Sequence, residues 1–294
     1  MVESRSAGDR LLSVVNYVLL CALTVIFLYP MLHVVMASFS DPSRLLAHKG
    51  LLLTPAGFSL EGYKIVLRNP NILTGYKNTL FYVVAGTSVN MLLTSLGAYV
   101  LSRRNLRMRG VMTVLIVFTM YFSGGLIPDF LLVKSLRLYN SRLALILPGA
   151  IATWNLMVMR TAFQQIPDSM EESAKIDGAN DFTILFRIIL PVAKATVAVM
   201  ILFYAVGHWN AWFNAMVYLQ KREMYPLQLL LREILLANSA SGNVLEAASE
   251  EGIFLLDELI KYCTIVISTL PILCIYPALQ KYFAKGVMLG SVKG

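Results

Sequence analysis

The side chains best placed to do chemistry lie in one polar segment, from Ile166 to Pro191, between two very apolar stretches. Its Glu172 carboxylate can form charge-assisted hydrogen bonds with an arginine or with a helix N-terminus of another protein. That chemistry suits docking rather than catalysis. A capped surface loop would also explain these residues, so the segment is either a plain connection or a docking element for a soluble partner.

Local signals predict two short helices joined by a turn in this segment. Ser169 and Glu172 have the spacing of a capping box, in which both side chains satisfy free amides of a first helical turn. Gly178 can adopt a left-handed conformation that ends the first helix. Asn180 can then cap a second helix that continues to Pro191. We therefore expect a helix-turn-helix over residues 166–191.

No metal site or catalytic cluster is expected elsewhere. An odd number of cysteines, all in apolar runs, argues against disulfides and zinc, and the histidines lack ligand spacing. There is no G-x-x-x-x-G-K-[ST] loop for phosphates. We expect no cofactor in this chain and no enzymatic activity of its own. The residues considered are Cys21, Cys263, Cys274, His33, His48 and His208.

The composition is that of a membrane protein. Hydrophobic residues make up 57% of the chain and charged residues 14%, against about 25% charged in soluble domains. The mean hydropathy is +0.66. The net charge of +8 could suggest a nucleic-acid partner, but the basic residues form no aromatic-interleaved patch. They lie mostly between apolar runs, where they set membrane orientation.

Six apolar intervals with almost no charge predict six transmembrane helices. Each is close to the about 20 residues that cross a hydrocarbon core, and backbone amides in lipid must pair within helices. We therefore expect an all-α polytopic membrane protein that forms one transmembrane domain over residues 1–294, with the 166–191 loop between spans four and five. The predicted spans are about 11–38, 78–102, 110–128, 143–163, 195–220 and 262–280.

Positive charge in one short connection predicts the orientation. Arg103, Arg104, Arg107 and Arg109 crowd the turn between spans two and three. Short loops rich in lysine and arginine face the cytoplasm. This places both termini and the 166–191 loop on the cytoplasmic side as well.

The spacing within the 166–191 loop resembles a known family motif. Glu172-Ser173-Ala174, then Gly178 after three residues and Ile188 after nine more, is similar to the EAA loop of ABC importer permeases. Asp177 and Ala179, which flank the glycine, resemble the maltose-type carbohydrate branch. The family pattern has alanine where this chain has Ser173, another small residue.

The resemblance covers nearly the whole chain. Trp209-Asn210 in span five and the C-terminal glycine-rich tail agree with the same family. The Tyr225-Pro226-Leu227 segment and the tail look most like permeases that import complex oligosaccharides.

The resemblance implies that the first helix of the loop is a coupling helix, seated in a groove of a separate ATP-binding subunit that carries ATP and Mg²⁺. Implied partners are a homologous second permease, two ATP-binding subunits, an extracellular solute-binding protein and an oligosaccharide, in a bacterial inner membrane. The implied docking residues are Met170, Glu171, Glu172, Ser173, Ala174, Asp177, Gly178 and Ala179, with tail contacts from Gly290, Val292 and Lys293.

Span five supplies candidates for the permeation path. Aromatic faces with interspersed amides suit sugar rings, although the same residues suit an interfacial aromatic belt. Much of the sugar contact could also lie on the partner permease. The candidates are Tyr204, His208, Trp209, Asn210 and Asn214.

We therefore interpret the chain as the permease subunit of an ATP-driven importer that takes up an oligosaccharide delivered by a solute-binding protein. A proton-coupled secondary transporter would need ionisable residues in mid-span, which are absent. An integral-membrane enzyme would need grouped carboxylates or metal ligands, and Asp129, Glu223 and Glu233 form no such group. The identity of the oligosaccharide, acidic such as alginate or neutral, stays open.

Overall fold

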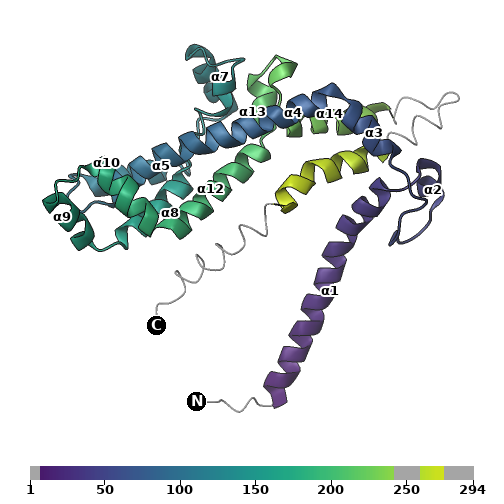
Figure 1. Cartoon of the computed structure of the whole chain (residues 1–294), viewed down its shortest axis with the longest axis horizontal. Coiled ribbons are helices and arrows are strands. Elements are labelled where there is room, and N and C mark those ends of the chain that lie inside the picture. Colours follow the sequence, from purple (N-terminus) through teal and green to yellow (C-terminus); the bar gives the residue numbers. More distant parts are fainter. Residues whose placement is uncertain (1–6, 242–258, 275–294) are drawn as a thin grey trace. The chain divides into compact units, whose positions relative to one another are not determined.

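The computed structural model describes residues 7–241 and 259–274, and within these ranges the protein is nearly all helical (Figure 1). The only β-type pairing in the described part is an isolated antiparallel bridge between Ser40 and Phe58. The predicted all-α class is therefore confirmed. By its contacts the chain divides into two compact units, residues 1–69 with 233–269 and residues 70–232 with 270–294, which are described separately below.

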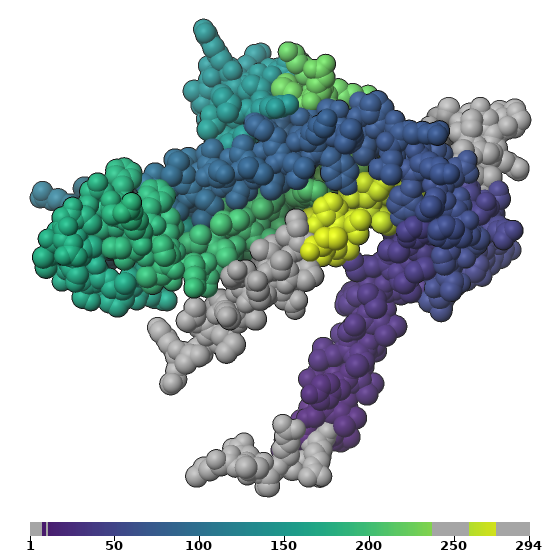
Figure 2. Space-filling view, viewed as in Figure 1, coloured from purple at the N-terminus to yellow at the C-terminus, as the bar shows by residue number. Residues whose placement is uncertain are grey.

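The first unit contains a long apolar helix, α1 (Ala7–Ser38). Its membrane-length part, Leu11–Ser38, has a mean hydropathy of 2.5, and none of its most apolar window is buried by the rest of the chain. Figure 2 draws α1 in purple as a single helix whose side chains face outward on the side seen in that view. A helix that is apolar on all sides and is not covered by the described residues of its own unit requires lipid or other protein around it. This helix matches the predicted span 11–38.

Short helices follow α1 in the first unit: α2 (Pro42–Ala47) and α3 (Glu61–Arg68). The helix Leu259–Cys274 packs against α3, where Gly62 leaves room for the Cys263 thiol. It covers the first part of the predicted span 262–280, and residues 275–280 lie outside the described residues.

The second unit is built around one helical stretch of 33 residues, Pro70–Ser102. It comprises α4 (Pro70–Phe81), a π-helical turn (Tyr82–Gly86) and α5 (Thr87–Ser102). The predicted span 78–102 therefore lies inside a longer helix. α5 packs on α8 (Thr153–Gln164) and α12 (Lys194–Trp209).

The intervals predicted as spans three to five contain breaks. The interval 110–128 is covered by α6 (Arg109–Phe118) and the start of α7 (Leu126–Ser135), with Gly125 at φ +87° between them. The interval 143–163 begins with a 3₁₀ turn (Arg142–Leu145) and an irregular segment before α8.

The interval 195–220 ends in a separate short helix, α13 (Phe213–Tyr218), and is followed by a 3₁₀ turn (Arg222–Met224) and α14 (Leu227–Ser241). Within the described ranges two helices are long and apolar enough to cross a membrane, or three if one bent pair is counted as a single span. Six spans therefore remain a prediction, because charge-free intervals report hydropathy and not helix continuity.

Candidate functional site

The polar segment singled out from the sequence folds as a helix, a turn and a second helix. α9 (Asp168–Ile176) begins directly after Pro167. The predicted capping box is wrong, because Pro167 occupies the N-cap and Ser169 already lies in the first turn, where its carbonyl accepts a 2.9 Å hydrogen bond from the Ser173 hydroxyl. Asp168 in the first turn instead places negative charge at the positive end of the helix dipole.

The end of α9 is a Schellman motif. Gly178 has φ +82°, its amide donates to Lys175 O at 3.0 Å, and the Ala179 amide donates to Ala174 O at 2.9 Å. This is the paired bond pattern that satisfies the last carbonyls of a helix through a left-handed residue. The predicted glycine C-cap is confirmed.

The second helix starts where the sequence predicted. The Asn180 side chain accepts a 2.8 Å hydrogen bond from the Thr183 amide at the start of α10 (Asp181–Ile184). The helix continues through a π-helical turn (Leu185–Ile189) and α11 (Leu190–Val192). It then bends by 91° into α12.

Only two residues of α9 are buried, and they hold the helix to the rest of the unit. Glu171 and Ala174 are each 8% exposed and lie three residues apart, on the same helix face. Ala174 belongs to an apolar core that also contains Tyr99 of α5, Phe163 of α8 and Ile184 of α10. The buried attachments of α9 are therefore one small apolar residue and one carboxylate.

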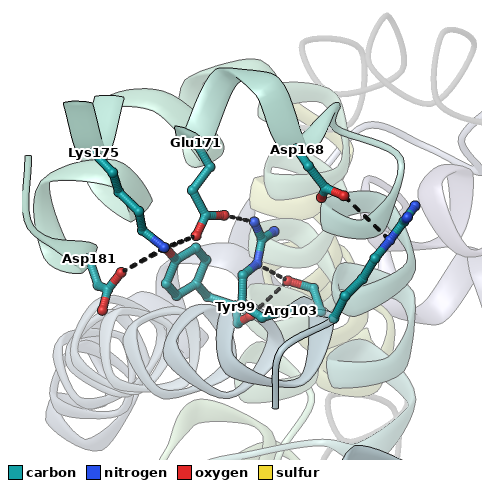
Figure 3. A network of polar contacts seen from close by, with 8 residues as sticks. Tyr99, Arg103, Asp168, Glu171, Lys175 and Asp181 are labelled. Carbon is teal, nitrogen blue, oxygen red and sulfur yellow. Dashed lines mark hydrogen bonds and ion pairs between the residues drawn. The ribbon is translucent and has the colours of Figure 1, made fainter. Parts of the chain in front are cut away.

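The buried carboxylate is the centre of a polar network (Figure 3). Glu171 forms an ion pair with Arg103, which follows the end of α5. Lys175 Nζ lies 2.7 Å from the same carboxylate, and the Tyr99 hydroxyl donates to it at 3.4 Å. Tyr99 also lies 3.4 Å from an oxygen of Asp181, and the Arg103 guanidinium sits over the Tyr99 ring at 4.8 Å.

A hollow of about 340 Å³ opens beside this network. One wall comes from the end of α5 and the residues that follow it, and the other from α9 and the start of α10. Cations and carboxylates therefore share one surface at the junction of three helices. The polar residues that line the hollow include Tyr99, Arg103, Arg104, Asp168, Glu171, Glu172, Lys175 and Asp181.

The opposite face of α9 is exposed. Glu172 and Ser173 are exposed there, as are Asp177 and Gly178 just beyond the helix end. Ile176 is 87% exposed, the highest value among the exposed large apolar side chains of the described residues. Such a face can supply both charge-assisted hydrogen bonds and apolar contact to another molecule.

The eight residues predicted to dock a partner therefore fall into two groups. Met170 is 40% exposed and joins the exposed face, Ala179 is half-buried against the core, and Glu171 and Ala174 face their own chain. Three features of the site were not predicted from the sequence: Ile176, Tyr99 and the ion-pairing role of Arg103. Ile176 could have been noticed as a lone branched apolar residue in a polar helix, whereas Arg103 lies 68 residues from its partner and gave no signal.

Two of the candidate path residues have their polar atoms bound within the chain. The Tyr204 hydroxyl pairs with Thr94 Oγ1 at 2.7 Å and accepts from the Ala152 amide at 3.1 Å. His208 Nε2 donates to Asn90 Oδ1 at 2.7 Å, and Asn90, fully buried, donates to the carbonyls of Gly149 and Ala150.

The other candidates differ in exposure. Trp209 is 6% exposed and packs edge-on against Tyr76, whereas Asn210 and Asn214 are exposed. The structure therefore brings Tyr204 and His208 together around the irregular segment before α8 and leaves the two asparagines accessible. The predicted tail contacts Gly290, Val292 and Lys293 lie outside the described residues.

In the described ranges no group of three or more histidine, cysteine, aspartate or glutamate side chains is arranged to hold a metal ion. The chemistry that the α9 region offers is recognition, through an exposed face that is positioned by a buried ion pair.

Comparison with known proteins identifies a family that matches the part of the chain containing this site. Residues 91–219, which contain α9 together with Tyr99 and Arg103, match the family described as binding-protein-dependent transport system inner membrane component. The polygalacturonan/rhamnogalacturonan transport system permease protein YtcP of Bacillus subtilis (strain 168) is 44% identical over 287 residues, which cover 97% of this chain and 99% of that protein. Protein LplC of the same organism is 40% identical over 298 residues, covering 100% and 98% of the two chains.

A solved structure agrees over the same length. The crystal structure of a bacterial ABC transporter involved in the import of the acidic polysaccharide alginate contains a chain that matches with a TM-score of 0.85. The two chains are 34% identical, and the match covers 95% of this chain and 98% of that chain.

Proposed function

As a member of the family of binding-protein-dependent transport system inner membrane components, this chain is the transmembrane permease subunit of a sugar ABC importer, and we propose that α9 docks an ATP-binding subunit while the cargo is an acidic oligosaccharide. Energy for uptake then comes from ATP bound with Mg²⁺ on the partner. This chain contributes the path and the surface that receives the partner's motion.

The division of α9 into two faces carries the docking proposal. Its inner face is tied down by Glu171 and Ala174, so the helix has a fixed position on the unit. Its outer face offers the Ile176 side chain beside the carboxylates of Glu172 and Asp177. An apolar anchor surrounded by charged groups is the usual make-up of a protein interface.

We place α9 on the cytoplasmic side, together with both chain termini. The support is the arginine cluster that follows α5, since such short basic connections face the cytoplasm. Arg103 and Arg104 contact α9 directly through Glu171 and Asp168, so α9 lies on the same side as the cluster.

The proposed assembly pairs this permease with a homologous second permease. Two ATP-binding subunits cover the cytoplasmic face, and a solute-binding protein delivers the sugar to the opposite face. The exposed length of α1 supports a second membrane subunit or lipid as its cover.

The acidic nature of the cargo rests on two kinds of support. The similar proteins are named for polygalacturonan/rhamnogalacturonan and for alginate. In this chain four exposed cations, Lys134, Arg137, Lys221 and Arg222, belong to connections predicted to face outward. Asn140 ties these connections together, because its Oδ1 accepts from the Gln220 and Lys221 amides at 2.9 and 3.1 Å. Cations at the mouth of a path attract uronate carboxylates.

Uptake by cells that express the complete transporter tests both parts. Oligogalacturonates should be imported in preference to neutral maltooligosaccharides of equal length, and import should require the ATP-binding subunits. Preferred uptake of the neutral sugar would contradict the acidic cargo. Uptake that persists without the ATP-binding subunits would contradict the docking role of α9.

A further inference from the structure

α9 has few attachments through which a partner's motion could enter this chain. It is joined covalently to α8 through residues 165–167 and to α10 through the glycine-containing turn at 177–180. Its non-covalent attachments to the unit's core are the Ala174 methyl group and the Glu171 carboxylate. A methyl group can slide over its neighbours, whereas an ion pair with hydrogen-bond geometry fixes direction.

The Glu171 attachment is shielded from solvent on both sides. The side chains of Glu171 and Arg103 are 10% and 18% exposed. Arg103 is itself oriented, because its Nε donates to the Ser102 hydroxyl at 3.0 Å and its guanidinium lies over the Tyr99 ring. A shielded pair is weakened little by salt, and without Arg103 the buried Glu171 carboxylate keeps as its cation only Lys175, whose side chain is 50% exposed.

The neighbouring ion pair of α9 provides a contrast. Arg104 Nε lies 3.4 Å from Asp168, but their side chains are 80% and 53% exposed. Exposed pairs of this kind contribute little, because solvent screens them. The two arginines therefore differ in environment although they are adjacent in sequence.

Arg103 directly follows a helix that reaches the other functional regions of the second unit. Within Pro70–Ser102, Asn90 holds both the irregular segment before α8 and His208 of α12. Further along, the Asn78 amide donates to the Glu223 and Tyr225 carbonyls at 2.6 and 3.0 Å. One continuous helix thus contacts α9 at one end, the path candidates in its middle and the 223–227 segment at the other end.

Resting on the proposed docking of α9, we propose that Arg103 and Glu171 are the positioning pair that transmits the motion of α9 to the Pro70–Ser102 helix. Glu172, next in sequence, faces outward and has no part in this transmission. Docking of the ATP-binding subunit is thereby assigned to the Glu172 carboxylate, and transmission of the motion of α9 to the neighbouring Glu171 carboxylate.

Charge exchange in the complete transporter tests this assignment. Arg103→Glu, Glu171→Arg and the double variant are purified with the partner subunits and reconstituted into liposomes. Three quantities are measured: retention of the ATP-binding subunit, ATP hydrolysis, and oligogalacturonate uptake per ATP hydrolysed. Arg104→Glu, which breaks the exposed pair, is the matched control.

We expect each single variant to retain the ATP-binding subunit and to lose about tenfold in uptake per ATP, within the usual range of coupling between sites. The double variant should recover most of this loss, and Arg104→Glu should match the unaltered transporter. Recovery by exchange shows that the pair is required and not either side chain alone, and retention of the ATP-binding subunit together with ATP hydrolysis shows that the single variants are folded.

Three results would overturn the assignment: normal uptake per ATP in the single variants, no recovery in the double variant, or loss of the ATP-binding subunit from Glu171→Arg. Failure of the docking proposal itself gives a different pattern. In that case Glu172→Arg and the Glu171 variants all retain the ATP-binding subunit, and its retention is insensitive to every change on α9.

Discussion

Glu171 and Glu172 are adjacent in the sequence, yet their carboxylates occupy opposite environments. Glu171 is 8% exposed and pairs with Arg103 and Lys175, whereas Glu172 lines the same hollow but is exposed. Consecutive helical residues are about 100° apart around the axis, so a short helix can present one carboxylate to its own chain and the next to a partner. The following predictions rest on this geometry and on the contacts of the Pro70–Ser102 helix.

Replacement of Ile176, the exposed apolar residue of α9, should weaken binding of the ATP-binding subunit. Ile176→Asp places a charge in the apolar centre of the proposed interface, and we expect a loss of about 2 kcal/mol, roughly thirtyfold in affinity, as for interface hot spots. Co-purification of the ATP-binding subunit measures this loss. Ile176→Leu should bind normally, and equal binding by the aspartate variant would remove Ile176 from the interface.

The turn after α9 should tolerate asparagine but not valine at position 178. Gly178 has φ +82° and no atom within 4 Å of an added Cβ, so any penalty comes from backbone conformation and not from a clash. The left-handed region costs a typical L-residue about 1–2 kcal/mol and asparagine less. Thermal unfolding of the purified transporter should show a lower melting temperature for Gly178→Val than for Gly178→Asn. Equal melting temperatures would contradict the Schellman assignment.

Sequence patterns correctly predicted those features of the 166–191 loop that depend on near neighbours in the chain. The glycine cap and the Asn180 cap depend on neighbours within four residues, and both were found as expected. The capping box failed because the helix begins at Asp168, with Pro167 as its N-cap, two residues earlier than a Ser169 N-cap would require. A capping signal in a sequence therefore predicts that a helix is present more reliably than it predicts the first residue of that helix.

Other features of the site could not be derived from the sequence, because they depend on contacts between distant residues. Arg103 was interpreted only as an orientation signal, although it pairs with Glu171. His208 was considered for sugar contact, but its imidazole is bound to Asn90, 118 residues away. Hydropathy likewise located apolar intervals without revealing the breaks between α6 and α7 or between α12 and α13.

The contact between Gly86 and His208 should show strong non-additivity. A Cβ on Gly86 would lie 2.4 Å from His208 Nε2, so Gly86→Ala must displace the imidazole from Asn90. We expect Gly86→Ala and His208→Ala each to lower the melting temperature. Because residues in contact couple by about 0.5–3 kcal/mol, the double variant should be destabilised by less than the sum. Strict additivity would mean that the imidazole does not pack on Gly86.

The hydrogen bond accepted by the Thr79 hydroxyl should slow the local unfolding of the segment before α14. The buried Leu227 amide donates to Thr79 Oγ1 at 2.8 Å. Thr79→Val keeps the shape and removes this acceptor, which leaves a buried amide unpaired at about 1–3 kcal/mol. Hydrogen exchange over residues 223–230 should accelerate.

Thr74→Val is the matched control for this change, because Thr74 is half-buried and its hydroxyl forms a solvent-exposed hydrogen bond to the Pro70 carbonyl of its own helix. Its exchange over residues 223–230 should equal that of the unaltered protein. If Thr79→Val gives the same result as this control, the Thr79 contact does not hold the segment.

Cross-linking of single cysteines along α9 to the ATP-binding subunit tests the central claim most directly. The complete transporter is prepared with Cys21, Cys263 and Cys274 replaced and with a cysteine in turn at positions 171, 172, 174 and 176, and each variant is treated with a short bifunctional thiol reagent. We predict cross-links to the ATP-binding subunit from positions 172 and 176 and none from 171 and 174, because the latter two face their own chain. Cross-links from 171 and 174, or none from 172 and 176, would contradict the account.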